Sequence, residues 1–72
     1  YYPAEAVSRG LEGEVRLMLA LTEDGSIADV QIASSSGHAI LDNAAIKAAY
    51  AMGRLNGVTA REMILPVIFR LQ

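Results

Sequence analysis

The sequence predicts an α+β domain in which two helices pack on one face of a three-stranded antiparallel sheet, with strand order two, one, three. Two segments, 14–21 and 62–71, carry an apolar residue at every second position, so that one face of each is continuously apolar, as in half-buried strands. A polar turn joins the first of them to another short apolar segment. Between residues 40 and 52, apolar residues recur every three or four positions, which is typical of an amphipathic helix.

The first element is a short helix over residues 1–10. Pro3 lies in its first turn, where the missing N–H costs nothing, and Gly10 provides a left-handed stop. A helix of about two turns does not persist alone in water. We therefore expect Val7 and Leu11 to dock it on the sheet.

The next two elements form a hairpin. One face of the first strand carries Val15, Leu17, Leu19 and Leu21. Residues 22–25 supply turn chemistry, with Gly25 able to take positive φ. The second strand covers residues 26–33, where Ile27 is out of phase with Val30 and Ile32. This slip indicates either a bulge or the twist of the turn near Ala28 and Asp29.

The second helix follows the serine-rich break at residues 34–36. Its predicted apolar stripe consists of Ile40, Leu41, Ala44, Ala45, Ala48 and Met52, and its opposite side of Asn43, Lys47 and Arg54. Gly53 ends the helix, and Asn56 with Gly57 forms a further turn. The alanines allow the helix to lie close to a sheet.

The last strand starts at Glu62. Its inner face is predicted to hold Met63, Leu65, Val67, Phe69 and Leu71. Pro66 cannot donate a ladder hydrogen bond, so this strand must lie at a sheet edge with Pro66 turned outward. The helix-free face is predicted to carry Glu14, Arg16, Met18, Ala20, Ile64, Ile68 and Arg70.

The composition limits the chain to one small domain over residues 1–72. It has no cysteine, which excludes disulfides and thiolate metal sites, and its net charge of −2 argues against nucleic-acid binding. No apolar run reaches the roughly 20 residues of a membrane span. Because the chain starts at Tyr1 rather than at a methionine, we expect it to be a fragment of a longer protein.

One cluster of residue types resembles a hydrolase site. Ser34, Ser35 and Ser36 could supply a nucleophile, with His38 as base and Asp42 as its orienting carboxylate. However, no nucleophile elbow surrounds them, and serines at a strand-to-helix junction commonly cap the helix. We therefore interpret them as capping residues, His38 as a surface or capping residue, and expect no catalytic residue.

Cofactor patterns are incomplete. Glu23, Asp24 and Asp29 lack the spacing of a calcium loop, and a single histidine without cysteine cannot form a zinc site. The glycines are scattered over separate turns instead of forming a phosphate-binding loop. So small a core leaves little room for a small-molecule substrate. We expect no metal, no cofactor and no enzyme activity.

The predicted edge strand is the feature with functional weight. Unpaired N–H and C=O groups at a sheet edge can accept an extended peptide as an added strand. Equally, a strand outside this fragment or a second copy of the domain could cover the edge. The residues alone leave both interpretations open.

An ordered set of short motifs covers nearly the whole chain. Its members are Tyr2-Pro3, Gly10-x-x-Gly13, Asp24-Gly25, Ser35-Ser36-Gly37, Asp42-x-Ala44-Ala45 and Pro66-Val67-x-Phe69-Arg70-Leu71. In this order they resemble the C-terminal domain of TonB and its relatives.

The resemblance implies a periplasmic domain joined by a proline-rich linker to one inner-membrane helix. It implies an energy transducer, in which the ExbB-ExbD motor acts on that helix while this domain binds the TonB box peptide of an outer-membrane receptor, for instance in iron-siderophore uptake. The TonB box adds to the third strand. This carries over to the candidate binding residues Ile64, Leu65, Pro66, Val67, Ile68, Phe69, Arg70 and Leu71.

The sequence departs from the family pattern after the second helix. The family usually has a tryptophan there, and this chain has Met52. A methionine specifies packing less sharply, so we expect a looser or rearranged connection. The departure leaves room for a TolA-like envelope protein or a TonB-type domain dedicated to one receptor or secretion system. The alternative function is a structural module that forms a homodimer through the same edge or through the face of Met18, Ile64 and Ile68.

Overall fold

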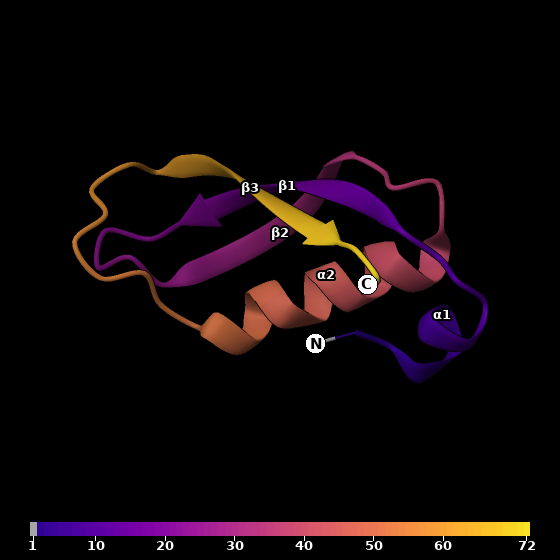
Figure 1. Cartoon of the computed structure of the whole chain (residues 1–72). Coiled ribbons are helices and arrows are strands. Elements are labelled where there is room, and N and C mark those ends of the chain that lie inside the picture. The colour runs from indigo at the N-terminus through magenta and orange to yellow at the C-terminus, as the bar shows by residue number, and fades with distance from the viewer. Residues whose placement is uncertain (1) are drawn as a thin grey trace.

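A computed structural model describes residues 2–72 as one sheet with two helices (Figure 1). The elements follow the chain in the order α1, β1, β2, α2 and β3. Their bounds are Ala4–Ser8, Gly13–Leu21, Ile27–Ser34, Ala39–Met52 and Glu62–Phe69. Each element lies where the sequence predicts it, although β3 ends at Phe69, two residues before the expected Leu71.

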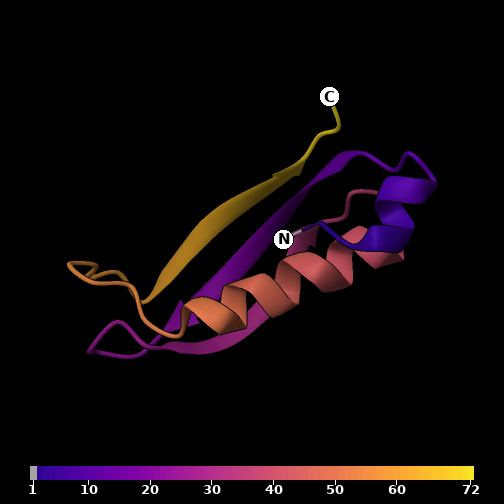
Figure 2. The ribbon, with the colours of Figure 1, turned by 60° about the horizontal axis from the view of Figure 1, so that its bottom comes forward.

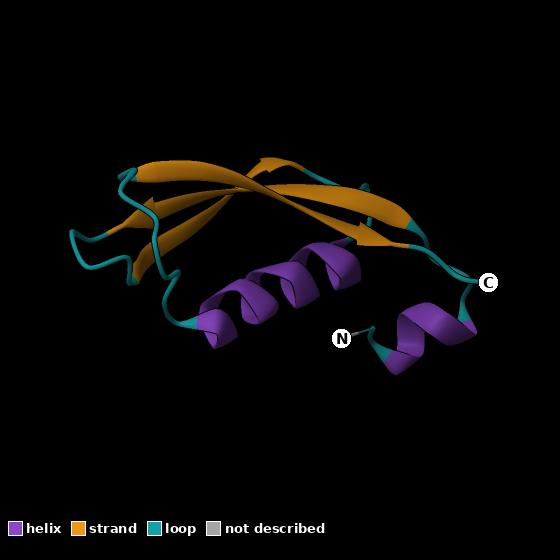
Figure 3. Ribbon diagram, turned by 60° about the vertical axis from the view of Figure 1, so that its left-hand side comes forward, coloured by secondary structure: helices purple, strands orange, loops and turns teal. Residues whose placement is uncertain are grey.

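The sheet has three strands in the order β2-β1-β3, and both pairings are antiparallel. Figure 3 shows the sheet as one layer with both helices on the same side of it. This confirms the predicted fold class and strand order. The β1–β3 register is continuous from Gly13 opposite Phe69 to Ala20 opposite Glu62.

The second strand contains the irregularity predicted from its sequence. The β1–β2 register shifts by one residue between Ala20 and Leu21, which leaves Ala28 as the extra residue of a bulge. A second shift near the other end of the pairing leaves Ala33 unpaired. The phase change at Ile27 is therefore a bulge within the strand.

The turn before β2 is fixed by side chains as well as by glycine. Gly25 has φ +86°, and the Asp24 carboxylate accepts hydrogen bonds from the Thr22 hydroxyl and, at 3.2 Å, from the Ser26 N–H. These bonds lower the pKa of Asp24 to about 2. The polar turn predicted at residues 22–25 is confirmed.

The core lies between the helix-facing side of the sheet and α2. Its largest fully buried side chains are Val15, Leu17, Leu19 and Leu41. Ala44 and Ala45 of α2 are buried beside them, as predicted, but the third buried alanine is Ala49, whereas the predicted Ala48 is only half-buried. The prediction that Met52 also lies on this stripe is wrong: Met52, in the last turn before the Gly53 cap, is 44% exposed.

Helix α1 docks through one of the two predicted residues, Leu11, but not through Val7. Val7 is 47% exposed, whereas Ala6 is fully buried. The anchoring ring comes from Tyr2, which packs edge-on against Phe69 of β3 with ring centroids 5.3 Å apart and donates a hydrogen bond to the carbonyl of Leu11. Leu11 is half-buried against the core, as expected. Tyr1, predicted to start this helix, lies outside the described residues.

Candidate functional site

The edge strand β3 has β1 as its one neighbour within residues 2–72. In Figure 2 it forms the rim of the sheet away from α2, which packs on β1 and β2. The long side of β3 that faces away from β1 is called the β3 edge below.

One hydrogen bond determines which backbone groups point to this edge. The Leu21 N–H donates to the Arg61 carbonyl at 2.7 Å, one position beyond the paired register. Hydrogen-bonded and non-hydrogen-bonded pairs alternate along an antiparallel ladder. The residues of β3 that bond to β1 are therefore Met63, Leu65, Val67 and Phe69, and those that direct their N–H and C=O groups outward are Glu62, Ile64, Pro66 and Ile68.

Pro66 lies opposite Arg16 in one of the non-hydrogen-bonded pairs. Its ring nitrogen therefore faces outward, where a missing N–H costs the sheet no hydrogen bond. This is the orientation that the sequence predicts for a proline inside an edge strand. The β3 edge thus keeps all of its carbonyl acceptors but lacks a donor at its centre.

The candidate binding residues divide into three groups in the structure. Ile64, Pro66 and Ile68 present backbone to the β3 edge, whereas Leu65, Val67 and Phe69 direct theirs to β1. The remaining two, Arg70 and Leu71, follow the end of the strand. The Leu71 N–H already donates to the Glu12 carboxylate at 2.7 Å, which fixes the chain after β3.

The side chains of β3 alternate between the two faces of the sheet. Ile64 and Ile68 are on the helix-free face, where they are 46% and 61% exposed. Leu65 and Val67 are on the helix side and are only half-buried, since α2 lies under the other two strands. A strand added at the β3 edge would therefore find apolar side chains next to it on both faces.

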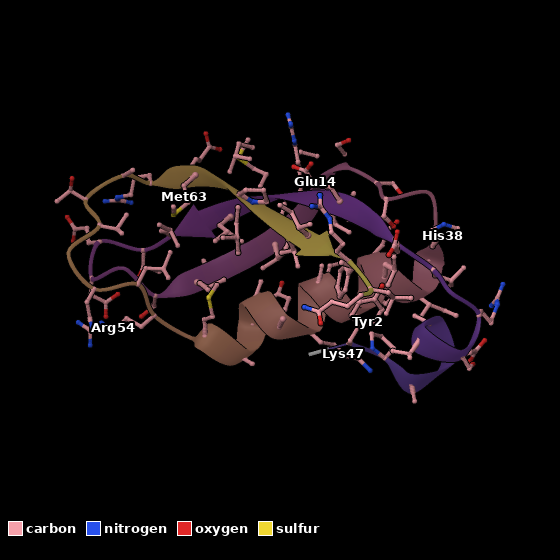
Figure 4. The ribbon with its side chains drawn as sticks, viewed as in Figure 1. Tyr2, Glu14, His38, Lys47, Arg54 and Met63 are labelled. Carbon is pink, nitrogen blue, oxygen red and sulfur yellow. The ribbon has the colours of Figure 1, made fainter. Side chains whose placement is uncertain are left out.

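The helix-free face carries two opposite charges on β1. Glu14 and Arg16 form an ion pair at 3.1 Å between side chains that are mostly exposed. Figure 4 labels Glu14 on this face and Tyr2 on the opposite side of the sheet. Arg16 and Glu14 lie opposite Pro66 and Ile68, so opposite charges are paired beside the apolar residues of β3, and Glu62 adds a charge at the other end of that strand.

The opposite edge of the sheet, on β2, is occupied by the domain's own chain. The Val30 N–H donates to the Tyr50 hydroxyl of α2 at 3.2 Å, and the Ile27 N–H donates to the Gly53 carbonyl at 2.9 Å. The bulges at Ala28 and Ala33 further distort this edge. A guest strand would meet fewer available donors here than at β3.

These hydrogen bonds of the β2 edge with Tyr50 and Gly53 were not predicted from the sequence. Tyr50 could have been noticed only as a large polar aromatic residue off the predicted apolar stripe of α2. The segment after α2, expected to be loose because Met52 replaces a tryptophan, is held to the hairpin. There the Leu55 N–H donates to the Gly25 carbonyl at 2.9 Å, and Arg54 forms an isolated bridge with Ser26.

The cluster that resembled a hydrolase site is a hydrogen-bonded group that connects the loop at residues 35–36 to the start of α2. Asp42, on the first turn of α2, accepts hydrogen bonds from the Ser35 hydroxyl and from the hydroxyl and N–H of Ser36, the last two at 2.8 and 3.0 Å. Burial raises the pKa of the Asp42 carboxyl, but these hydrogen bonds outweigh it, and the net pKa lies below its usual value.

The predicted capping role of the serines is wrong in its details. No side-chain hydrogen bond caps the N-terminus of α2, where His38 is the cap residue. The serine hydroxyls instead accept from loop amides, Ser36 from the His38 N–H at 3.1 Å and Ser35 from the Gly37 N–H at 3.0 Å. The serines therefore face Asp42 and the loop backbone instead of a histidine base.

Other site types find little support among residues 2–72. No three acidic or histidine side chains gather there as metal ligands would, and no helix is long and apolar enough to cross a bilayer. An open hollow of about 320 Å³ lies where β1 begins and β3 ends, lined by Glu12, Gly13, Glu14, Ile68, Phe69 and Arg70. Half of its lining residues are charged, which does not match a largely apolar ligand pocket.

Two curated proteins are similar to this chain in sequence. Protein tonB2 of Pseudomonas aeruginosa is 47% identical over 47 residues, which are 65% of this chain and 17% of that protein. Protein TonB of Helicobacter pylori strain J99 is 40% identical over 47 residues, again 65% of this chain and 17% of that protein. The chain thus spans a small part of the curated relatives that it matches.

Solved structures agree over the whole chain. The solution structure of the Helicobacter pylori TonB-CTD has a TM-score of 0.81 and 29% identity, covering 100% of this chain and 69% of that one. The Pseudomonas aeruginosa TonB CTD has a TM-score of 0.77 and 29% identity, covering 100% and 78%. The profile of the family described as Gram-negative bacterial TonB protein C-terminal matches residues 1–71. The chain belongs to this family.

Proposed function

We propose that this domain is the periplasmic coupling domain of a TonB-like energy transducer, and that it binds the TonB box peptide of an outer-membrane transporter as an added strand at the β3 edge. The main observation in support of this proposal is the contrast between the two edges of the sheet. The β2 edge is occupied by Tyr50 and Gly53, whereas the outward groups of Ile64 and Ile68 are bonded to nothing else within residues 2–72.

A strand added there would resist pulling. The hydrogen bonds between guest and β3 would lie side by side and across the strand direction, so a force along the guest loads them together. Each bond contributes about 1 kcal/mol net, and a row of them makes a mechanically useful attachment. The apolar side chains of Ile64 and Ile68 add burial on the helix-free face.

The rest of the role concerns parts of the protein outside these residues. We propose that the domain is connected on its N-terminal side to an inner-membrane helix driven by the ExbB-ExbD motor, and that it acts in the periplasm without enzymatic activity. Its work would energise transport across the outer membrane, for instance of iron-siderophores. The family and the solved TonB domains of the same fold support this proposal.

An NMR titration with amide hydrogen exchange tests the peptide site. The probe is a TonB box peptide from a transporter encoded in the same genome. Binding should shift the Ile64 and Ile68 amides and slow their exchange. The Leu65 and Val67 amides already bond to β1, so their protection should change less.

A matched control peptide has the same length but prolines at adjacent positions throughout the segment that would pair, so that donors towards β3 are missing in either phase of the ladder. It should leave the β3 amides unchanged. Shifts confined to α2 or β2, or equal shifts with both peptides, would contradict strand addition at β3.

The alternative function is that of a TolA-like or divergent envelope interaction module that dimerises without energising a transporter. The exposed side chains of Ile64 and Ile68, next to Met18 of β1, favour it. Sedimentation over a range of concentrations separates the two functions. A protein that stays monomeric at high concentration would exclude the dimerising module, and a dimer that prevents peptide binding would exclude the coupling function.

A further inference from the structure

Pro66 interrupts the β3 edge in a way that affects different partners unequally. The residues that face outward are Glu62, Ile64, Pro66 and Ile68, and Pro66 is the one that cannot donate. A foreign strand without proline that covers this edge therefore loses one hydrogen bond. The carbonyl of the guest that faces Pro66 is the group left without a donor.

A second copy of this chain would lose more. When two β3 edges pair over most of their length, the overlap contains the Pro66 of both copies, and two donors are missing. In the register that places the two prolines opposite each other, both bonds of one pair vanish and the two rings meet. In every other register with extensive overlap, one hydrogen bond is missing at each of two separate pairs, one for each Pro66.

The apolar side chains on this strand cannot make the distinction by themselves. Ile64 and Ile68 flank Pro66 on the same face and are largely exposed, so they favour any strand that covers them. Discrimination between partners requires an element that penalises the wrong one. Proline on an edge strand is a known means of discouraging pairing between copies.

We infer that Pro66 is a specificity-determining residue that favours a foreign strand over a second copy of this chain at the β3 edge; the inference rests on the proposed function. The inference predicts how the effect of Pro66 on self-association compares with its effect on guest binding. If the missing N–H acts once against a guest and twice against self-pairing, restoring it changes self-association by the square of its effect on guest binding.

The test is Pro66→Ala, which restores the outward N–H. One net hydrogen bond corresponds to about fivefold in affinity, so the variant should bind the TonB box peptide about fivefold more tightly and self-associate about 25-fold more strongly. Peptide affinity is measured by calorimetry and self-association by sedimentation, with Ile64 amide exchange locating the dimer interface.

A matched pair of variants applies the opposite change. Ile68→Pro removes a second outward donor without touching the ladder, because Ile68 and Glu14 form a non-hydrogen-bonded pair. Relative to Ile68→Ala, it should weaken peptide binding about fivefold and reduce self-association further. Circular dichroism checks that both variants fold.

The outcomes separate the two proposals. Equal changes of peptide affinity and self-association in Pro66→Ala, or no change in either, would overturn the role of Pro66. Failure of the wild-type and all variants to bind the peptide, together with a Pro66→Ala dimer at Ile64, would overturn the proposed function but support Pro66 as a barrier to self-pairing.

Discussion

At the scale of single residues, Asp42 is the buried charge that most constrains this domain. Its carboxylate is 8% exposed and joins the loop at residues 35–36 to the first turn of α2. A buried carboxylate is tolerated only when hydrogen bonds replace its water shell. The motif pair Ser35-Ser36 and Asp42 is thus one structural unit whose members are separated in sequence.

This arrangement predicts how stability depends on pH. The pKa of Asp42 is lowered in the folded state, so the carboxylate stabilises the fold above its unfolded pKa of about 4, and this contribution is lost as pH falls through the lower folded pKa. We expect Asp42→Asn to lose about 1–3 kcal/mol near neutral pH, and the difference from wild type to shrink towards pH 2. Urea unfolding at several pH values measures it.

Two points make this prediction specific. Glu23→Gln removes the same charge from a side chain that is 89% exposed, and it should change stability by much less. Because the pKa of Asp24 is also lowered, some acid sensitivity should remain in Asp42→Asn. A stability difference that stays constant from neutral pH to pH 2 would contradict the assignment.

Residue-level expectations failed where tertiary contacts decide burial. Val7 was expected to dock α1 and Met52 was placed on the apolar stripe of α2, but both lie towards the ends of their helices and are 47% and 44% exposed. The positive φ of Gly25 was predicted correctly from the turn sequence, but this is only one of two reasons why a glycine is needed there. A Cβ on Gly25 would also lie 2.4 Å from the Leu55 carbonyl oxygen, a contact between distant segments that no local pattern reveals.

At the scale of elements, the strand order and the identity of the edge could be predicted, because alternation and a mid-strand proline are local signals. The outward orientation of Pro66 was predicted too, and it fixes the phase of the ladder, because alternate residues of the strand share it; the bond between Leu21 and Arg61 agrees with this phase. The hydrogen bonds that occupy the β2 edge could not be predicted. Their prediction requires knowing that the α2 side chain of Tyr50 reaches the Val30 N–H, twenty residues earlier.

The hydrogen bond between Val30 and Tyr50 makes a testable difference between the two sheet edges. Tyr50→Phe keeps the ring but removes the hydroxyl that accepts from Val30 and contacts Asp29. We expect a stability loss of about 1 kcal/mol and faster exchange of the Val30 amide, because that donor is left without its partner. NMR hydrogen exchange gives both quantities.

The control for this variant is Tyr2→Phe, whose lost hydroxyl donates to the Leu11 carbonyl and makes no hydrogen bond to β2. It should leave the local exchange of Val30 unaffected once the change in global stability is subtracted. Unchanged Val30 exchange in Tyr50→Phe would mean that the β2 edge is protected by its bulges alone.

At the scale of the whole molecule, α1 is attached differently from the other elements. It has five residues, and its contacts with the remainder run through Ala6, Leu11 and the Tyr2 ring on Phe69. The sheet and α2, in contrast, share a continuous buried core. A segment with so few buried contacts is expected to open locally before the rest unfolds. If the domain is pulled from its N-terminal side, as proposed, α1 bears the load first.

We therefore predict two levels of stability in native-state hydrogen exchange. The amides of Val7, Arg9 and Leu11, which bond within the α1 turn, should exchange through a local opening with little urea dependence. Amides at the centre of β1 should exchange only through global unfolding. Ala49→Gly, in the buried face of α2, should lower the β1 opening free energy by about 1 kcal/mol and leave that of α1 unchanged.

Tyr2→Ala provides the complementary result. Its contacts break in both openings, so the two opening free energies should fall by the same amount as long as α1 stays docked. A domain in which α1 and β1 exchange with one common free energy and urea slope would unfold as a single unit. Force entering from the N-terminal side would then load the β3 attachment directly, without prior release of α1.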